Sequence, residues 1–397
     1  MKIAARVGKI QPSLTLAVSA KAAKLKAEGK DIVAFGVGEP DFDTPEHVKA
    51  AAVAALQTGV SKYTAVSGTL ELRAAVAEEL GRAHDVKLVP EQVIISVGAK
   101  HSLYNLLMAF LDDGDEVIIP APCWVSYPEL VQMAGGIPRL LHTRPSEKFR
   151  FDEGALRSLV TPKTRAILLN SPCNPTGAVY DGATLDAVIK VARAHPEIVI
   201  VTDDIYRRLV YGVPWLSIAK RAPDLANRIV LVDGVSKSYA MTGWRIGFCA
   251  GPRELIGAMD TLQGQSTSNP TAIAQAAALA ALTGSHDPVE AMRLEFDRRR
   301  QAMVARLGAI ADVKLVTPEG AFYCFPDLSA YLDTKMRDDI ALAEHFLQHG
   351  VALVPGSGFF APGFVRISYA TSMAQIEKGL DRIATALSAL RLSTNLG

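Results

Sequence analysis

The chain has 397 residues, of which 49% are hydrophobic and 21% charged, a composition typical of a large globular domain accompanied by a smaller one. Its 42 basic and 41 acidic residues leave a formal net charge of +1, so composition gives no electrostatic case for binding nucleic acid or an anionic membrane. The four cysteines lack metal-type spacing, which predicts reduced thiols and no metal site. Neither a signal-type N-terminus nor a run of about 18 apolar residues is found, which predicts a soluble, cytoplasmic protein.

Short apolar runs alternate with helical patterns through the middle of the chain. Unbroken β-branched runs between amphipathic helices indicate a mostly parallel sheet that is covered on both faces. The strand candidates lie at 93–97, 116–120, 165–170, 198–202 and 229–233. The helix candidates lie near 69–83, 101–111, 126–135, 182–194 and 270–283.

The two ends of the chain do not show this alternation of strand and helix patterns. Residues 1–45 look irregular, with a loop-like GVGEPDFDTP, and the fold is expected to begin near residue 30. A long charged helix is expected at 288–309, followed by short strands and helices that end near residue 390. Periodicity alone does not say whether the two ends meet.

Four notable residues each follow one of the strand candidates: Gly98, Asn174, Asp203 and Lys237. Ligands of parallel α/β sheets bind beyond the carboxyl ends of the strands, so we expect these residues to share a site. A lysine amine can form a Schiff base with an aldehyde, and Arg245 can hold a phosphate with two parallel hydrogen bonds. Pyridoxal phosphate (PLP) carries both groups. The alternative is an ordinary pair of loop cations.

The segments SKSYAMTGWRIG and NSPCNPTG, with GEPDFDTP before them and VRISYATS after them, resemble fold-type I PLP-dependent aminotransferases of class I/II. The resemblance covers nearly the whole chain and is closest to the bacterial aspartate aminotransferase branch. It implies an α/β fold in which a large domain, 46–283, holds a mostly parallel seven-stranded sheet between helices. Residues 1–45 and 284–397 are then expected to form a smaller α+β domain.

The phosphate end of the cofactor is assigned to a turn that leads from a strand into a helix. Gly98 and Ala99 occupy this turn, where unpaired N–H groups and the helix dipole favour an anion. The resemblance adds Arg245 and Ser236. It also implies that Tyr63 reaches the phosphate from a second subunit of a homodimer with shared sites, which the loop 263–270 would face. The alternative for Tyr63 is a half-buried packing role.

The cofactor ring requires a carboxylate at its nitrogen, hydrogen bonds to its phenolic oxygen and a stacking partner. By resemblance these are Asp203 for the nitrogen, Tyr206 and Asn174 for the oxygen, and Trp124 for the ring face. Trp124 could also be a buried core residue. Neighbouring Asp204 is expected to point away from the ring.

The substrate end requires a cation for the carboxylate of an amino acid. Arg366 lies in an apolar strand and demands an anionic partner if it is buried. The resemblance makes it the carboxylate clamp, with a backbone donor from Gly38 close by and with Trp124 and Asn174 also lining the substrate. Lys100 is assigned both to the cofactor site and to a distal substrate carboxylate. Relatives that accept prephenate carry a basic residue where this chain has Gln11, which argues against prephenate.

The resulting prediction is PLP-dependent transamination from L-aspartate to 2-oxoglutarate. Lys237 would hold the cofactor and then act as general base and acid, although a free lysine with a pKa of ~10.4 is a poor base at neutral pH. Other substrates remain open, namely the pair prephenate and glutamate, or alanine, aromatic or kynurenine-type amino acids as donors. A PLP lyase or synthase is a rival on the same fold. A non-enzymatic PLP-binding regulator is a further rival, but it would need a helix-turn-helix extension for which the sequence has no room.

Overall fold

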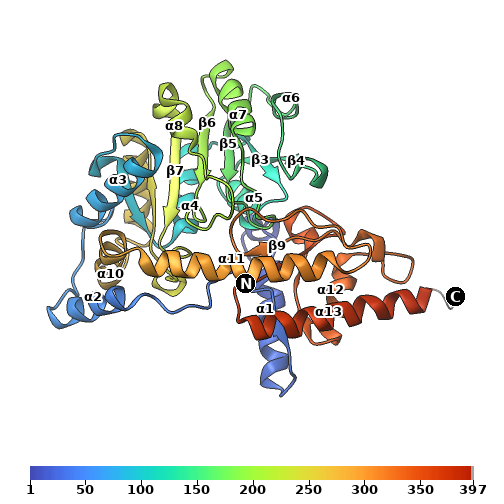
Figure 1. Cartoon of the computed structure of the whole chain (residues 1–397). Helices are drawn as coiled ribbons and strands as arrows, with labels where there is room; N and C mark the ends of the chain where they lie inside the picture. The colour runs from blue at the N-terminus through green and yellow to red at the C-terminus, as the bar shows by residue number, and fades with distance from the viewer. Residues whose placement is uncertain (395–397) are drawn as a thin grey trace.

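The computed structural model describes residues 1–394 and contains the predicted seven-stranded, mostly parallel sheet (Figure 1). Six strands run parallel, and β8 runs antiparallel to both of its neighbours. In spatial order the strands are β2 (Val93–Ser96), β8 (Gly247–Ala250), β7 (Ile229–Gly234), β6 (Val199–Asp203), β5 (Thr164–Asn170), β3 (Glu116–Ala121) and β4 (Ile137–His142).

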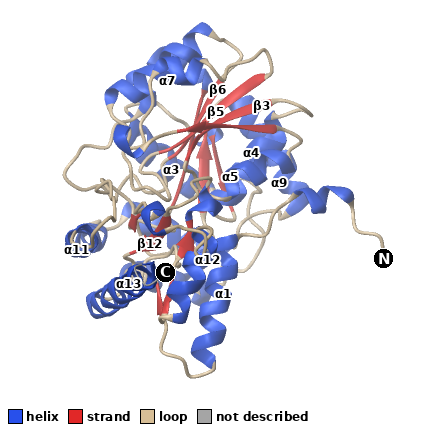
Figure 2. Ribbon diagram, turned by 90° about the vertical axis from the view of Figure 1, so that its right-hand side faces the viewer, coloured by secondary structure: helices blue, strands red, loops and turns tan. Residues whose placement is uncertain are grey.

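Both faces of this sheet are buried under helices, as Figure 2 shows. Alternate residues of one strand serve opposite faces: Ile167 and Leu169 of β5 pack on one side, and Ala166 and Leu168 on the other. One side carries α4 (Ala99–Phe110), α5 (Ser126–Met133) and α9 (Arg253–Ser266). The other side carries α3 (Leu70–His84), α7 (Gly182–Ala194), α8 (Ile218–Arg221) and α10 (Ala272–Thr283), with α2 (Glu46–Gln57) and α6 (Glu153–Arg157) packed at its edges.

The two ends of the chain do meet. The strand β1 (Val33–Ala34) pairs in parallel with β10 (Val351–Ala352). Beside them β11 (Val354–Pro355), β12 (Val365–Ser368) and β9 (Tyr323–Cys324) form an antiparallel sheet. Four helices surround these strands in the lower part of Figure 1: α1 (Leu14–Ala27), α11 (Asp287–Gly308), α12 (Asp339–Gln348) and α13 (Met373–Thr394). The proposed division at 46 and 283 stays a prediction.

The sequence expectations were wrong or incomplete at several elements. Residues 14–27 form a helix rather than irregular chain, capped by the Ser13 hydroxyl, so ordered structure begins before residue 30. Only Ala22 of this helix is buried, and apolar residues such as Leu16 and Ala17 are exposed, so the sequence shows no clear apolar stripe. The edge strand β4 was missed because it is only half buried and contains Pro138 and Arg139. Helix α9 was also missed, and it extends through Ser266 into the segment expected to be a loop.

Within residues 1–394 no helix is both long and apolar enough to cross a membrane.

The contact between α13 and the N-terminal strand region leaves no space for a methyl group at Gly379. A Cβ there would lie 2.3 Å from the buried ring of Phe35. We therefore expect Gly379→Ala to lower the free energy of unfolding by about 1–3 kcal/mol. Gly257→Ala on α9, where a Cβ meets nothing within 4 Å, is the control and should raise it by about 0.5–1 kcal/mol. Denaturant unfolding measures both, and equal stability of the two variants would contradict this packing.

Candidate active site

A cavity of about 500 Å³ opens beyond the carboxyl ends of the central strands. Its walls come from both parts of the fold, because α1, β9 and β12 of the terminal part close over the sheet. Most of the residues singled out from the sequence line it: Gly38, Ala99, Lys100, Trp124, Asn174, Asp203, Tyr206, Ser236, Lys237, Arg245 and Arg366.

Parallel register brings the key side chains together. Asn170 at the end of β5 pairs with Asp203 at the end of β6, and its side-chain amide donates to the Asp203 carbonyl at 2.9 Å. The Asn170 side-chain oxygen then accepts the backbone N–H of Asn174 at 2.9 Å. Asn170 was not predicted, although it opens the NSPCNPTG segment. It fixes the loop that presents Asn174 to the cavity.

The amine of Lys237 lies in the loop after β7 and donates to the Gly38 carbonyl at 2.6 Å. Burial lowers the pKa of Lys237 to about 8; the charges of Arg366 and Arg245 add to this, against the pull of Glu39. Gly38 had been expected to act as a backbone donor beside Arg366. Its carbonyl accepts a hydrogen bond from Lys237, and the donor role of its N–H toward a substrate stays a prediction.

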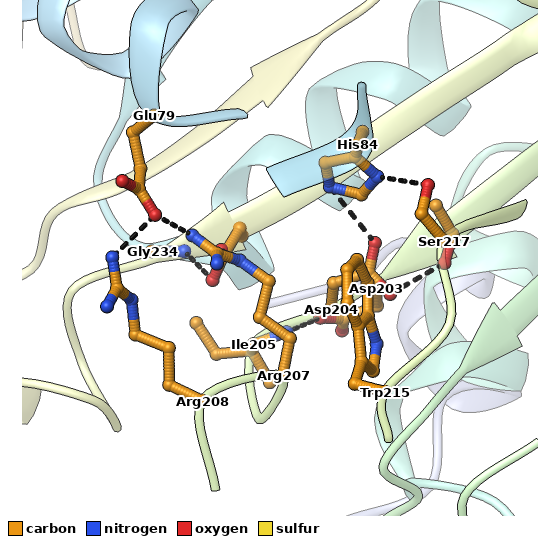
Figure 3. Close-up of polar contacts among 12 residues, drawn as sticks. Glu79, His84, Asp203, Asp204, Ile205, Arg207, Arg208, Trp215, Ser217 and Gly234 are labelled. Atoms are coloured by element: carbon orange, nitrogen blue, oxygen red, sulfur yellow. Dashed lines mark hydrogen bonds and ion pairs between the residues drawn. The ribbon is translucent and has the colours of Figure 1, made fainter. Parts of the chain in front are cut away.

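Asp203 is a buried carboxylate at the floor of the cavity. Its Oδ2 accepts the Tyr127 hydroxyl at 2.7 Å, and its Oδ1 accepts the N–H of Ile205 at 3.2 Å. Burial raises the pKa of Asp203 to about 6 despite these hydrogen bonds. The next residue, Asp204, points away as expected, accepts the Thr202 hydroxyl at 2.8 Å and does not line the cavity (Figure 3).

Further aromatic side chains line the cavity around Asp203. The hydroxyls of Tyr206 and Tyr323 lie 2.9 Å apart, which joins the β6 loop to β9 of the terminal part. The Trp124 ring is half-buried and faces the cavity, and the amine of Lys100 lies 4.8 Å from its centroid. Burial lowers the pKa of Lys100, and the nearby charge of Arg245 lowers it further.

Two glycines allow the chain to close tightly around the start of α4. Gly98 has a φ of +87°, and a Cβ there would meet the guanidinium of Arg245 at 2.4 Å. A Cβ on Gly247 would meet the backbone nitrogen of Ala99 at 2.0 Å. Gly98 therefore lies behind Arg245 rather than on the cavity wall. Arg245 donates to the carbonyls of Thr242 at 2.9 Å and Val97 at 3.3 Å, and no described carboxylate pairs with it.

Arg366 of β12 is a buried cation without an anionic partner among residues 1–394. Its side chain is 2% exposed and donates to the side-chain oxygen of Asn174 at 2.9 Å and to the Gly36 carbonyl at 2.8 Å. The guanidinium also lies over the Tyr323 ring, 4.4 Å from its centroid. Burial lowers the pKa of Arg366, and its Nε has no partner among residues 1–394. Such an arrangement favours an anionic ligand.

Tyr63 does not join the site within one chain. Its side chain is 91% exposed and lies outside the cavity, so the half-buried packing role is wrong for the isolated chain.

Sequence reasoning missed one complete wall of the site. The face of α1 toward the cavity contributes Ser13, Thr15, Leu16 and Ser19. These residues could not be found because the segment was expected to be irregular. Tyr127 and Tyr323 were missed as well, although Tyr127 lies in the same APCWVSYPE segment as Trp124.

Comparison with known proteins places this geometry in a family. The family model described as "Aminotransferase class I and II" matches residues 30–383. An aspartate/prephenate aminotransferase of Nitrosomonas europaea is 46% identical, over 98% of this chain and 100% of that protein. An aspartate aminotransferase of Geobacillus stearothermophilus is 45% identical, over 96% of this chain and 98% of that protein.

A solved structure agrees with the sequence relatives. The aspartate aminotransferase of Thermus thermophilus with maleate has a TM-score of 0.93 and 44% identity, and covers 97% of this chain and 100% of that one. The match covers nearly the whole of both chains. The chain belongs to the class I and II aminotransferase family and is an aminotransferase enzyme.

Proposed function

We propose that this enzyme uses PLP to move the amino group of L-aspartate to 2-oxoglutarate, giving oxaloacetate and L-glutamate. One observation carries the proposal: two cations, Arg245 and Arg366, line one cavity without carboxylate partners in the described chain. The Lys237 amine is close enough to both for their charges to lower its pKa. An amino acid and a phosphorylated aldehyde would supply the two missing anions.

The donor set fits PLP. Arg245 and the N–H groups that start α4 would hold the phosphate, and the lack of a Cβ on Gly98 leaves room for the guanidinium there. Tyr206 and Asn174 would bond the phenolic oxygen. The buried carboxyl of Asp203, whose pKa is raised to about 6, forms no ion pair within the described chain. A protonated pyridine nitrogen would provide the positive partner. When bound, PLP would supply an electron sink for the electron pair at the amino acid Cα.

The remaining chemistry belongs to residues of the chain. Arg366 would hold the α-carboxylate with its guanidinium fork and so fix the Cα–H bond relative to Lys237. A lysine with a pKa of about 8 has an appreciable neutral fraction near neutral pH and can therefore take and return a proton at Cα. This removes the objection that an ordinary lysine is a poor base.

The preference for aspartate is argued from Lys100 and from the relatives. Lys100 lines the cavity, has no carboxylate within ion-pair distance among the described residues, and could meet the distal carboxylate of an acidic substrate. Several similar proteins are named aspartate aminotransferases. The Nitrosomonas relative and a curated sequence relative from Thermus thermophilus are named aspartate/prephenate aminotransferases, so prephenate is the second candidate acceptor.

We further propose a cytoplasmic homodimer with shared sites. Tyr63 projects its ring into solvent from one chain, as a residue that completes a neighbour's site would. All four cysteines are free and buried, which suits a reducing compartment.

The first test removes the proposed catalytic amine. Lys237→Ala should abolish transamination between aspartate and 2-oxoglutarate, together with the visible absorbance of lysine-bound PLP, because no other group can replace the amine at that point. Lys87→Ala, which changes an exposed lysine, is the control and should behave as the wild type. Retained turnover in Lys237→Ala would disprove the assignment.

The second test concerns the pKa of the Lys237 amine in the cofactor-free protein. Only the neutral amine reacts with an acylating reagent, so its labelling rate should rise with pH with a midpoint at about 8. Solvent-exposed lysines should have a midpoint at their ordinary value of ~10.4. Mass spectrometry of the labelled peptides follows both classes in one sample. A Lys237 midpoint equal to that of the exposed lysines would contradict the lowered pKa.

The third test concerns substrate choice. Lys100→Ala should lower kcat/KM for aspartate by about 10-fold or more, since an ion pair to a desolvated carboxylate is lost. Alanine, which has no distal carboxylate, should be affected much less. A panel of aspartate, alanine, phenylalanine and kynurenine against 2-oxoglutarate, with prephenate as an alternative acceptor, gives the full profile. Unchanged aspartate efficiency would remove Lys100 as the specificity residue.

A further inference from the structure

A buried ionic bridge lies directly behind the cavity. Arg207 follows Tyr206 in the loop after β6, and its side chain is 9% exposed. Its Nε donates to Oδ2 of Asp233 at 2.7 Å, and its Nη2 donates to Oε1 of Glu79 at 2.5 Å. Figure 3 shows Arg207 beside Glu79 of α3 and the Gly234 end of β7. One guanidinium therefore joins three segments: the β6 loop, β7 and α3.

Two groups of this bridge, Glu79 and Arg207, are held in their charged forms, whereas burial raises the pKa of Asp233 against the lowering effect of the Arg207 charge. Burial opposes ionisation of Glu79, but the charges of Arg207 and Arg208 outweigh it and hold the pKa of Glu79 at about 2. Arg208 also donates to Glu79 at 2.5 Å, so this carboxylate is held by more than one cation. Burial acts against the charge of Arg207, but Asp233 and Glu79 raise its pKa. A buried charge held between charged partners has one well-defined position.

The bridge lies just beyond the end of the β6–β7 ladder, although Asp233 and Gly234 still pair with Phe248 and Gly247 of β8. The paired residues of β6 and β7 end at Asp203 and Val232. Beyond this point the β6 loop carries Tyr206, and the β7 loop carries Lys237. Asp233 lies between these regions: its Oδ1 accepts the N–H of Gly234 at 2.7 Å while its Oδ2 accepts from Arg207. The carboxylate thus ties the start of the lysine loop to the residue that follows Tyr206.

We propose that Arg207 is a positioning residue that sets the separation between the Tyr206 hydroxyl and the Lys237 amine. It touches neither substrate nor cofactor, because it does not line the cavity. It acts through Asp233 on the loop that carries Lys237, and through the connecting backbone on its sequence neighbour Tyr206. Its contact with Glu79 anchors it to α3. The inference rests on the proposed function, in which these two groups contact the same small cofactor.

The test compares two arginines that share the Glu79 anchor. Arg207→Lys keeps the charge but cannot reach Asp233 and Glu79 from two edges of one planar group. Arg82→Lys is the control, because Arg82 is 64% exposed, pairs with Glu79 and makes no contact with Asp233. Asp233→Asn is the second test variant. It keeps an oxygen acceptor for the N–H of Gly234 and removes the negative charge of Asp233 from the bridge. This variant keeps the proposal testable if Arg207→Lys folds poorly.

Two readouts are independent of turnover: the dissociation constant of PLP from the purified protein, and the visible circular dichroism of bound PLP, which reports its orientation. We expect Arg207→Lys and Asp233→Asn to weaken PLP binding about 10-fold, to alter the dichroism and to lower kcat more than KM, because a misplacement of about 1 Å can cost up to 100-fold in rate. Arg82→Lys should match the wild type in all three measurements.

The proposal is overturned if both test variants keep wild-type PLP affinity, dichroism and kcat and lose only thermal stability. That result would make the bridge purely structural and would leave the proposed function intact. The proposed function itself fails separately, if Lys237→Ala retains transamination.

Discussion

The parallel pairing of β5, β6 and β7 is the constraint on which the site depends. Because these neighbouring strands run in one direction, their carboxyl ends meet at one edge and deliver Asn174, Asp203 and Lys237 to one cavity. Helices on both faces bury the strands, so the edge is the remaining place for polar chemistry. The terminal part of the fold then closes this edge with α1, β9 and β12 and brings Arg366 into reach.

The electrostatics of the cavity follow from this closure. Burial lowers the pKa of Lys237 and of Arg366 and raises that of Asp203, so burial disfavours the charged form of each group. The cations are left without carboxylate partners, whereas the buried Arg207 behind the site has two. The buried charge that holds the backbone, Arg207, is therefore paired with carboxylates. The cations that face the cavity have no carboxylate partner among the described residues, as a site for anionic ligands requires.

The sequence predicted elements well where the pattern was strong. The central strands and α3, α4, α7 and α10 lie close to their expected positions, because long apolar runs and clear amphipathic stripes depend on local spacing alone. Helix α1 and strand β4 were not predicted because they lack such patterns: the helix buries only Ala22, and the strand is a half-exposed edge strand. Their structure depends on what packs against them.

By itself the sequence determined the order of the polar residues that follow each strand and, through continuous segments such as NSPCNPTG and SKSYAMTGWRIG, the family resemblance and the candidate cofactor residues. It could not determine which distant residues complete the site. The pairing of Tyr206 with Tyr323, the wall formed by α1, and the bridge from Arg207 to Glu79 each join segments far apart in the chain. Only the tertiary structure decided these contacts, because they depend on packing between elements, which local spacing does not encode.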